Sequence, residues 1–127
     1  MIRTLALASL AATALAGPAA AAPAAHQCFF ANQLSSWTAA GDSTVNLRVG
    51  VNDFYQLQLL GPCPDLKWAE SIGIKTRGGS DNICSGLDVE LIVPSTVTHT
   101  VPQRCMATSL RKLSPDEAAA LPRKQKP

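Results

Sequence analysis

Hydrophobic and polar residues alternate in the middle of the chain. Apolar side chains occupy every second position from Val45 to Val49 and again from Tyr55 to Leu59, with mostly polar side chains between them. A period of two is the spacing of a β-strand with one buried face. Gly50 and the residues up to Asp53 supply turn-forming chemistry between the two runs. We therefore predict an antiparallel hairpin over residues 44–59.

The same pattern predicts strands on both sides of this hairpin. Leu87 to Val93 keeps the period of two until Pro94, and Cys105 to Leu113 indicates a final strand. Residues 29–37 are a mixed segment, typical of a first strand or an extended arm.

A short helix is predicted near the C-terminus. Ser114 is a favoured N-cap residue, Pro115 suits the first helical position and Glu117 can complete a capping box. Pro122 then ends the helix. Residues 123–127 form a basic tail that we expect to be disordered.

Residues 65–77 allow two interpretations. Asp65 can cap a short helix that runs to Ile72. Alternatively, Ile72 and Ile74 begin another strand that ends at Arg77. Taken together, these segments predict a mainly β fold of five or six short strands, with one or two short helices. A small antiparallel barrel, roll or sandwich fits that count.

The first 21 residues have the three-part pattern of a signal peptide. Arg3 supplies a positive charge, Leu5 to Leu15 forms an apolar segment, and small residues follow it. The apolar segment is shorter than the roughly 20 residues that a membrane-spanning helix needs. We expect cleavage after position 21, with positions 16 and 24 as alternatives, and a disordered stub over residues 22–27. The protein is then periplasmic or secreted.

Length and charge add two limits. The chain has 127 residues, which suits one domain. Without Arg3, ten of its eleven Lys and Arg residues stand against nine Asp and Glu, so the mature chain carries a net charge of +1. A near-neutral domain gives no electrostatic reason to bind nucleic acid. No later segment is long and apolar enough to span a membrane.

Four cysteines remain in the mature chain: Cys28, Cys63, Cys84 and Cys105. An even number behind a signal peptide predicts two disulfides, each worth about 2–4 kcal/mol to a small domain. Three pairings are possible. We favour Cys63–Cys84, which closes a local loop, with Cys28–Cys105, which joins the ends of the domain. The predicted organisation is a disulfide-stapled β domain over residues 28–113, then a short helix and basic tail over residues 114–127.

The cysteine spacing also bears on metal and redox chemistry. Neighbouring cysteines lie 35, 21 and 21 positions apart. A structural zinc site draws its ligands in close pairs, and a thioredoxin-like site needs Cys-x-x-Cys. We therefore expect neither a metal nor a cofactor.

The cysteines and their apolar neighbours resemble a known family. The matching residues are Cys28-Phe29, Tyr55-x-Leu57-x-Leu59, Cys63-Pro64-Asp65-Leu66, Ile83-Cys84, and Cys105 followed by Leu110 and Leu113. This pattern covers nearly all of residues 28–113 and is similar to a domain-of-unknown-function family of small exported proteobacterial proteins with four spaced cysteines. The resemblance implies a bacterial envelope location and assigns no activity, cofactor or catalytic residue.

The candidate binding residues are Arg77, Gly78, Gly79 and Ser80. Glycines expose backbone N–H groups that can receive an anion, although the P-loop spacing is absent and a plain turn between strands is the alternative. Our first hypothesis is a non-enzymatic envelope protein, monomeric, that presents residues 76–82 to an unknown protein partner or ligand.

Two other functions remain open. A secreted enzyme inhibitor would present the same loop to a protease. A small hydrolase would use Ser85, Asp88 or His99, because a nucleophile needs a base and an orienting group within reach. Nothing in the spacing of these three residues singles them out, and we assign no catalytic residue.

Overall fold

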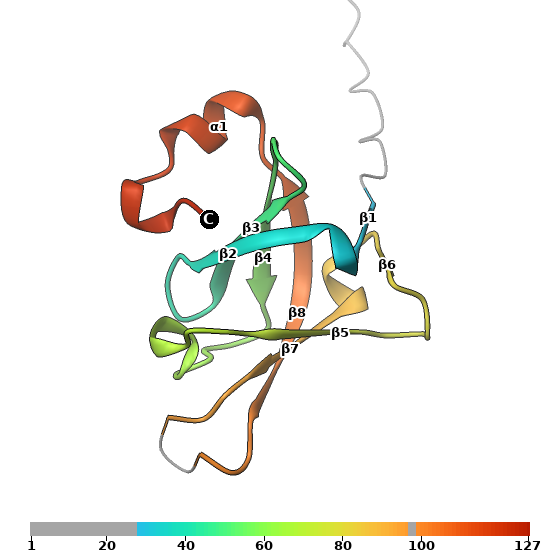
Figure 1. The fold of residues 1–127 in the computed structure, drawn as a ribbon, viewed down its shortest axis with the longest axis vertical. Helices are drawn as coiled ribbons and strands as arrows, with labels where there is room; N and C mark the ends of the chain where they lie inside the picture. The colour runs from blue at the N-terminus through green and yellow to red at the C-terminus, as the bar shows by residue number, and fades with distance from the viewer. Residues whose placement is uncertain (1–27, 97–98) are drawn as a thin grey trace, which may run out of the picture.

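The protein folds around one curled antiparallel sheet. The structure is a computed structural model that describes residues 28–96 and 99–127. Six strands form a half-barrel, and two disulfides staple it (Figure 1). The predicted mainly β, disulfide-stapled fold is confirmed. The predicted signal peptide, its cleavage positions and the stub lie outside the described residues.

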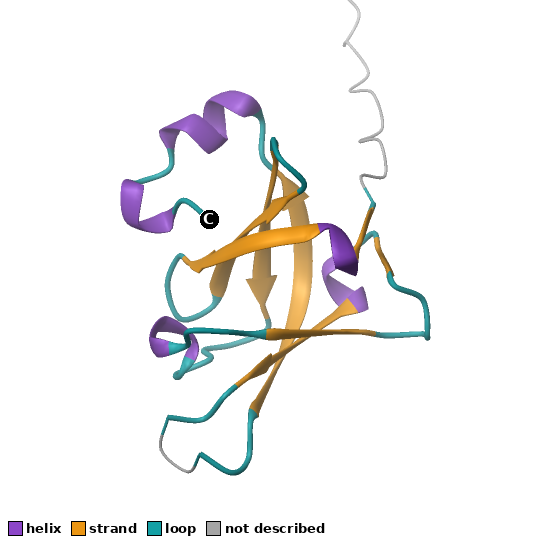
Figure 2. Ribbon diagram, viewed as in Figure 1, coloured by secondary structure: helices purple, strands orange, loops and turns teal. Residues whose placement is uncertain are grey.

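The strands of the large sheet are, in spatial order, β2 (Leu34–Ala39), β3 (Thr44–Val49), β4 (Asp53–Leu59), β8 (Gln103–Lys112), β7 (Val89–Val93) and β5 (Gly73–Thr76). β1 (Phe29–Phe30) and β6 (Asn82–Ile83) form a separate two-stranded ladder. The helical segments of the described residues are the α-helix α1 (Pro115–Ala120) and the 3-10 turns η1 (Ala31–Gln33), η2 (Leu66–Trp68), η3 (Gly86–Asp88) and η4 (Arg123–Gln125), which Figure 2 draws in purple.

The predicted central hairpin is confirmed. β3 and β4 pair antiparallel without interruption up to Val49 and Asp53. Their alternate apolar residues face the inside of the curl, where they meet the apolar residues of β7. The buried hydrophobic residues include Phe29, Val45, Leu47, Val49, Tyr55, Leu57, Leu59, Leu66, Ile83, Val89, Leu91 and Val93.

The sheet does not close into a full barrel. β2 and β5 are its two edges, and Figure 1 shows both of them crossing in front of the remaining strands. Because no ladder joins β2 to β5, a seam remains between the two edges.

The predicted C-terminal helix is also confirmed. The Ser114 hydroxyl accepts a hydrogen bond from the Glu117 N–H, and the Glu117 carboxylate accepts one from the Ser114 N–H. This reciprocal pair is a capping box. Pro115 is the first helical residue, and the helix stops before Pro122.

The prediction of a disordered tail is wrong. The tail contains η4 and lies over the outer face of β2 and β3. The Asn46 side chain is fully buried and donates a hydrogen bond of 2.9 Å to the Gln125 carbonyl. The Thr38 hydroxyl donates one of 3.0 Å to the Lys126 carbonyl. Two polar residues on the outer sheet face therefore bind the tail backbone.

Residues 65–77 take the strand alternative. The predicted helix is reduced to the single turn η2, and β5 follows from Gly73. The physical reason is that the Asp65 carboxylate does not cap the turn; it accepts a hydrogen bond of 2.7 Å from the Thr96 hydroxyl. The strand predicted to begin at Leu87 begins at Val89 instead, and Leu87 lies exposed in η3.

The disulfides join Cys28 to Cys84 and Cys63 to Cys105. The favoured pairing, Cys63–Cys84 with Cys28–Cys105, is therefore wrong. β4 and β7 are both antiparallel to β8, so they run in the same direction. Cys63 follows the end of β4 and Cys84 precedes the start of β7, which places these two cysteines at opposite ends of the sheet.

Candidate functional site

The predicted binding residues lie in the loop that joins β5 to β6. We call residues 77–81 the β5–β6 loop, and all five of them are exposed. Gly78 and Gly79 have φ angles of 83° and 73°. Residues other than glycine rarely adopt these backbone angles, so the turn depends on the glycine pair. The loop therefore projects from the sheet with a fixed turn at its centre.

Backbone hydrogen bonds hold both ends of the loop. At the first end, the Arg77 N–H donates to the Asp88 carbonyl at 2.9 Å, which extends the β5–β7 ladder by one position. At the second end, the Ala31 N–H donates to the Asp81 carbonyl at 2.9 Å. The exposed residues between these two bonds are therefore held in place at both ends of the loop.

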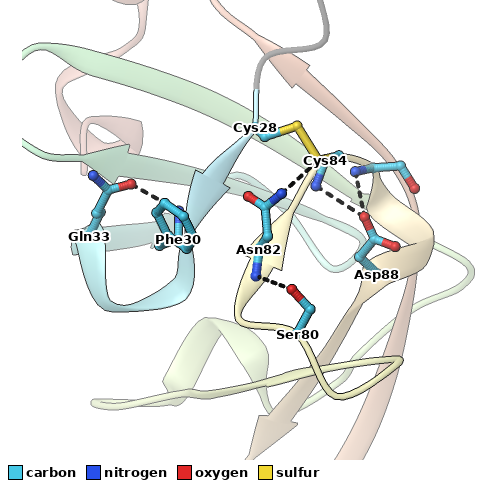
Figure 3. Close-up of a disulfide and its surroundings, with 8 residues drawn as sticks. Cys28, Phe30, Gln33, Ser80, Asn82, Cys84 and Asp88 are labelled. Atoms are coloured by element: carbon cyan, nitrogen blue, oxygen red, sulfur yellow. Dashed lines mark hydrogen bonds between the residues drawn. A yellow bond between two sulfur atoms is a disulfide. The ribbon is translucent and has the colours of Figure 1, made fainter.

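A disulfide strengthens the second end. Phe29 pairs with Ile83 in the β1–β6 ladder, which sets Cys28 opposite Cys84. Figure 3 shows the resulting bridge beside Asn82, whose side-chain amide donates a hydrogen bond of 3.3 Å to the Cys84 sulfur. The loop is therefore pinned by the Cys28–Cys84 disulfide, and not by the Cys63–Cys84 bridge that the sequence favoured.

The four predicted binding residues do not converge on one point. The Arg77 guanidinium reaches β8 and donates to the Met106 sulfur at 3.0 Å. The Ser80 hydroxyl accepts a hydrogen bond of 3.2 Å from the Asn82 N–H, a local turn interaction drawn in Figure 3. The Arg77 guanidinium and the glycine turn are therefore adjacent in sequence, but they do not form one anion-binding site.

Arg77 instead joins a charged group on the outer face of β5, β7 and β8. The register places Lys75 opposite Glu90, and Glu90 opposite Met106. Arg104 forms an ion pair of 3.3 Å with the nearly buried Glu90 carboxylate. This group holds three cations and one carboxylate. We call it the outer face, and its five residues are Lys75, Arg77, Glu90, Arg104 and Met106.

A shallow pocket of about 240 Å³ adjoins the outer face. Its lining residues are Leu60, Gly61, Pro62, Arg104, Cys105 and Met106. Leu60 is 73% exposed, so the pocket has an apolar rim beside a basic group. Such a combination suits a protein or peptide surface with acidic and apolar side chains.

The residues proposed for a hydrolase do not assemble. The Ser85 hydroxyl accepts a hydrogen bond from the Leu87 N–H, and the Asp88 carboxylate accepts from the Cys84 and Ser85 N–H groups. Both side chains thereby cap η3, as Figure 3 shows for Asp88. Ser85 precedes β7 and the exposed His99 follows it, and the five residues of this strand span roughly 16 Å. The structure does not bring Ser85 and His99 together.

Within residues 28–96 and 99–127, no three His, Cys, Asp or Glu side chains are grouped so that they could hold a metal ion. All four cysteines are in disulfides. No helix in the described part of the chain is long and apolar enough to cross a membrane.

Comparison with known families places the chain in one of them. A family model of unknown function, DUF6491, covers residues 1–127. The chain belongs to this family. No curated protein and no solved structure matches the chain. Membership confirms the predicted unknown-function family, which extends over the whole chain; an exported, proteobacterial origin stays a prediction.

Sequence reasoning missed the residues that share the outer face with Arg77. Lys75, Arg104 and Met106 come from two strands, and only the antiparallel register brings them together. The alternation around Glu90 did indicate which residues of β7 face outward. It could not indicate which side chains stand beside them, because strand order depends on the whole sheet.

Proposed function

We propose that this protein is a non-enzymatic binding module of the bacterial envelope, and that its β5–β6 loop contacts a protein partner. The observation that carries this proposal is the pinned, exposed loop: residues 77–81 are exposed, and backbone hydrogen bonds hold Arg77 and Asp81. A loop that is ordered before binding loses less conformational entropy when it binds.

The outer face supports the choice of partner. Lys75, Arg77 and Arg104 outnumber Glu90, and an apolar pocket adjoins them. Opposite charge on a partner would steer its approach and select it over basic proteins. We therefore expect the partner to present an acidic surface to this side of the sheet.

Site-specific photo-crosslinking tests the proposal. Ser80 is replaced by p-benzoylphenylalanine in the full-length chain, in the cells that naturally make the protein. We expect irradiation to yield one discrete protein adduct, and we expect Arg77→Ala to reduce its yield severalfold. The same photoreactive residue at Val51, which is 71% exposed at another loop, is the matched control. Equal adducts at both positions, or no adduct at position 80, would contradict the proposal.

The pinned loop also favours one alternative, an enzyme inhibitor. A rigid exposed segment resists the distortion that cleavage requires, and Arg77 lies where a protease with an acidic specificity pocket could bind. A panel of serine and cysteine proteases discriminates this function from the first. Inhibition with slow cleavage after Arg77 would support it, whereas rapid cleavage without inhibition would exclude it.

We further propose that the chain acts in the periplasm or outside the cell. Two disulfides support this location, because disulfides persist in oxidising compartments. The test is the intact mass of the native protein after thiol alkylation without reductant. We expect a chain that begins at residue 22, carries no alkyl adduct and lacks four hydrogens. A full-length mass or alkylated cysteines would refute export or disulfide formation, respectively.

A further inference from the structure

The free edge of β2 presents unpaired backbone groups. The Ala40 N–H donates to the Thr44 carbonyl at 2.8 Å, in the same register that pairs Thr38 with Asn46. In an antiparallel ladder, hydrogen-bonded pairs alternate with non-hydrogen-bonded pairs. Trp37 and Ala39 fall at the alternate positions, so their N–H and C=O groups point away from β3.

Nothing in the described structure satisfies these groups. Among residues 28–96 and 99–127, no hydrogen bond is made to the backbone N–H or C=O of Trp37 or Ala39. The edge therefore offers two donors and two acceptors at the spacing of a β-strand. Exposed edges of this kind are templates for pairing with another extended chain.

A groove of about 320 Å³ runs along the same edge. It is lined by three consecutive β2 residues, Trp37 to Ala39. Consecutive strand residues face opposite sides of the sheet, so a groove that touches all three follows the backbone edge. The other lining residues are Leu66, Lys67, Ala69 and Glu70 around η2, and Lys124 from the tail.

Among the described residues, the unpaired charges that line the groove are the cation of Lys124 and the carboxylate of Glu70. Lys67 is already paired with Asp42 at 2.9 Å. Lys124 has no carboxylate within 4.0 Å among the described residues, and Glu70 is the one acidic residue that lines the groove. An acidic side chain on an occupant could therefore pair with Lys124.

We propose that the β2 edge is a second binding site, which takes an extended peptide segment of a partner protein. The segment adds as a strand beside β2, bonds to the backbone of Trp37 and Ala39, and directs an acidic side chain to Lys124. This mode of recognition obtains affinity from main-chain hydrogen bonds and specificity from side-chain pockets. The site is independent of the β5–β6 loop, so Arg77→Ala should leave it unchanged.

The test begins with a library of linear peptides displayed on phage, selected against the immobilised wild-type protein. An enriched peptide is then synthesised and titrated against Ala39→Pro. Proline at position 39 removes an outward N–H and leaves the β2–β3 ladder intact, because that N–H does not bond to β3. We expect Ala39→Pro to weaken binding about 5–10-fold, the effect of about one hydrogen bond.

A charge-reversal pair tests the acidic contact. Lys124→Glu should weaken the peptide by at least about threefold, whereas Lys126→Glu, which does not line the groove, should not. Amide hydrogen exchange then locates the peptide without relying on any variant. In the free protein the Trp37 and Ala39 amides should exchange faster than the Thr38 amide, and the bound peptide should slow both.

Three outcomes would overturn the inference. The first is a library that yields no enriched peptide. The second is a peptide that binds Ala39→Pro as tightly as the wild type and does not slow exchange at Trp37 and Ala39. The third is a wild-type dimer, detected by sedimentation, that Ala39→Pro dissociates. The last outcome would make a second copy of this chain the occupant. Because Arg77 lies outside the groove, loss of either site alone separates this inference from the function proposed for the loop.

Discussion

At the scale of single residues, Gly86 allows η3 to lie directly against β8. It is buried, and a Cβ atom at this position would overlap the backbone N, Cα and C atoms of Ser109. Backbone atoms cannot move aside as the end of a side chain can, so even one methyl group forces the two segments apart.

We predict that Gly86→Ala lowers the free energy of unfolding by about 1–3 kcal/mol. Gly61→Ala is the matched control, because a Cβ atom there would meet no atom within 4 Å. Urea unfolding followed by circular dichroism measures both. Equal midpoints for the two variants would show that η3 does not pack against Ser109 as described.

Asn46 is the polar residue on which the tail depends. Its amide donates to the Gln125 carbonyl and its oxygen accepts from the Gln56 side chain at 3.2 Å. Gln56 in turn lies beside Arg111. A row of polar side chains thus crosses the outer sheet face and ends on the C-terminal segment.

Asn46→Ala should lower the free energy of unfolding by about 1–3 kcal/mol, because it removes the buried side chain that bonds to the half-buried Gln125. It should also speed trypsin cleavage after Lys124, which is measured by mass spectrometry over time. Thr44→Ala serves as the control. Thr44 lies on the same strand as Asn46, and its exposed hydroxyl bonds to Gln58 of β4 and not to the tail. If both variants are cleaved at the same rate, Asn46 does not hold the tail.

At the scale of elements, α1 is stabilised by a titratable cap. Hydrogen bonds from the Ser114 backbone N–H and from Arg111 lower the pKa of Glu117 below its ordinary value. A lowered folded-state pKa contributes stability that is present above the unfolded pKa. That contribution is lost as the pH falls through the lowered pKa.

We therefore predict that α1 frays in acid, below the ordinary glutamate pKa. NMR titration of the Glu117 carboxyl and the Ser114 amide should show one shared transition in that range. Glu117→Gln should abolish this transition, whereas Asp116→Asn in the same turn should preserve it. A Ser114 amide that titrates in Glu117→Gln would mean that another group controls the cap.

At the scale of the whole molecule, the disulfide pairing depends on the order of the strands in the sheet. Trypsin is expected to place each cysteine on its own peptide. The relevant cleavage sites follow Arg48, Lys67, Arg77, Arg104 and Arg111. Without reduction, the Cys28 peptide should remain linked to residues 78–104, and residues 49–67 to residues 105–111. A link between residues 49–67 and 78–104 would contradict the strand order.

The sequence by itself determined the local elements. The period of two at Val45 to Leu59 specified the hairpin, and Ser114, Pro115 and Glu117 specified α1. These features depend on neighbours a few residues away, so the chain carries the information directly. The location of the β5–β6 loop was predictable for the same reason, from its glycine pair.

Only the tertiary structure decided what these elements meet. Strand order and register determine that Cys28 pairs with Cys84 and that Arg77 lies beside the other residues of the outer face. They also leave the edge of β2 open. The tail was expected to be disordered because it is a basic chain end, yet the side chain of Asn46, far away in sequence, bonds to its backbone. Contacts between distant segments depend on the packing of the whole chain, and a single sequence does not display that packing locally.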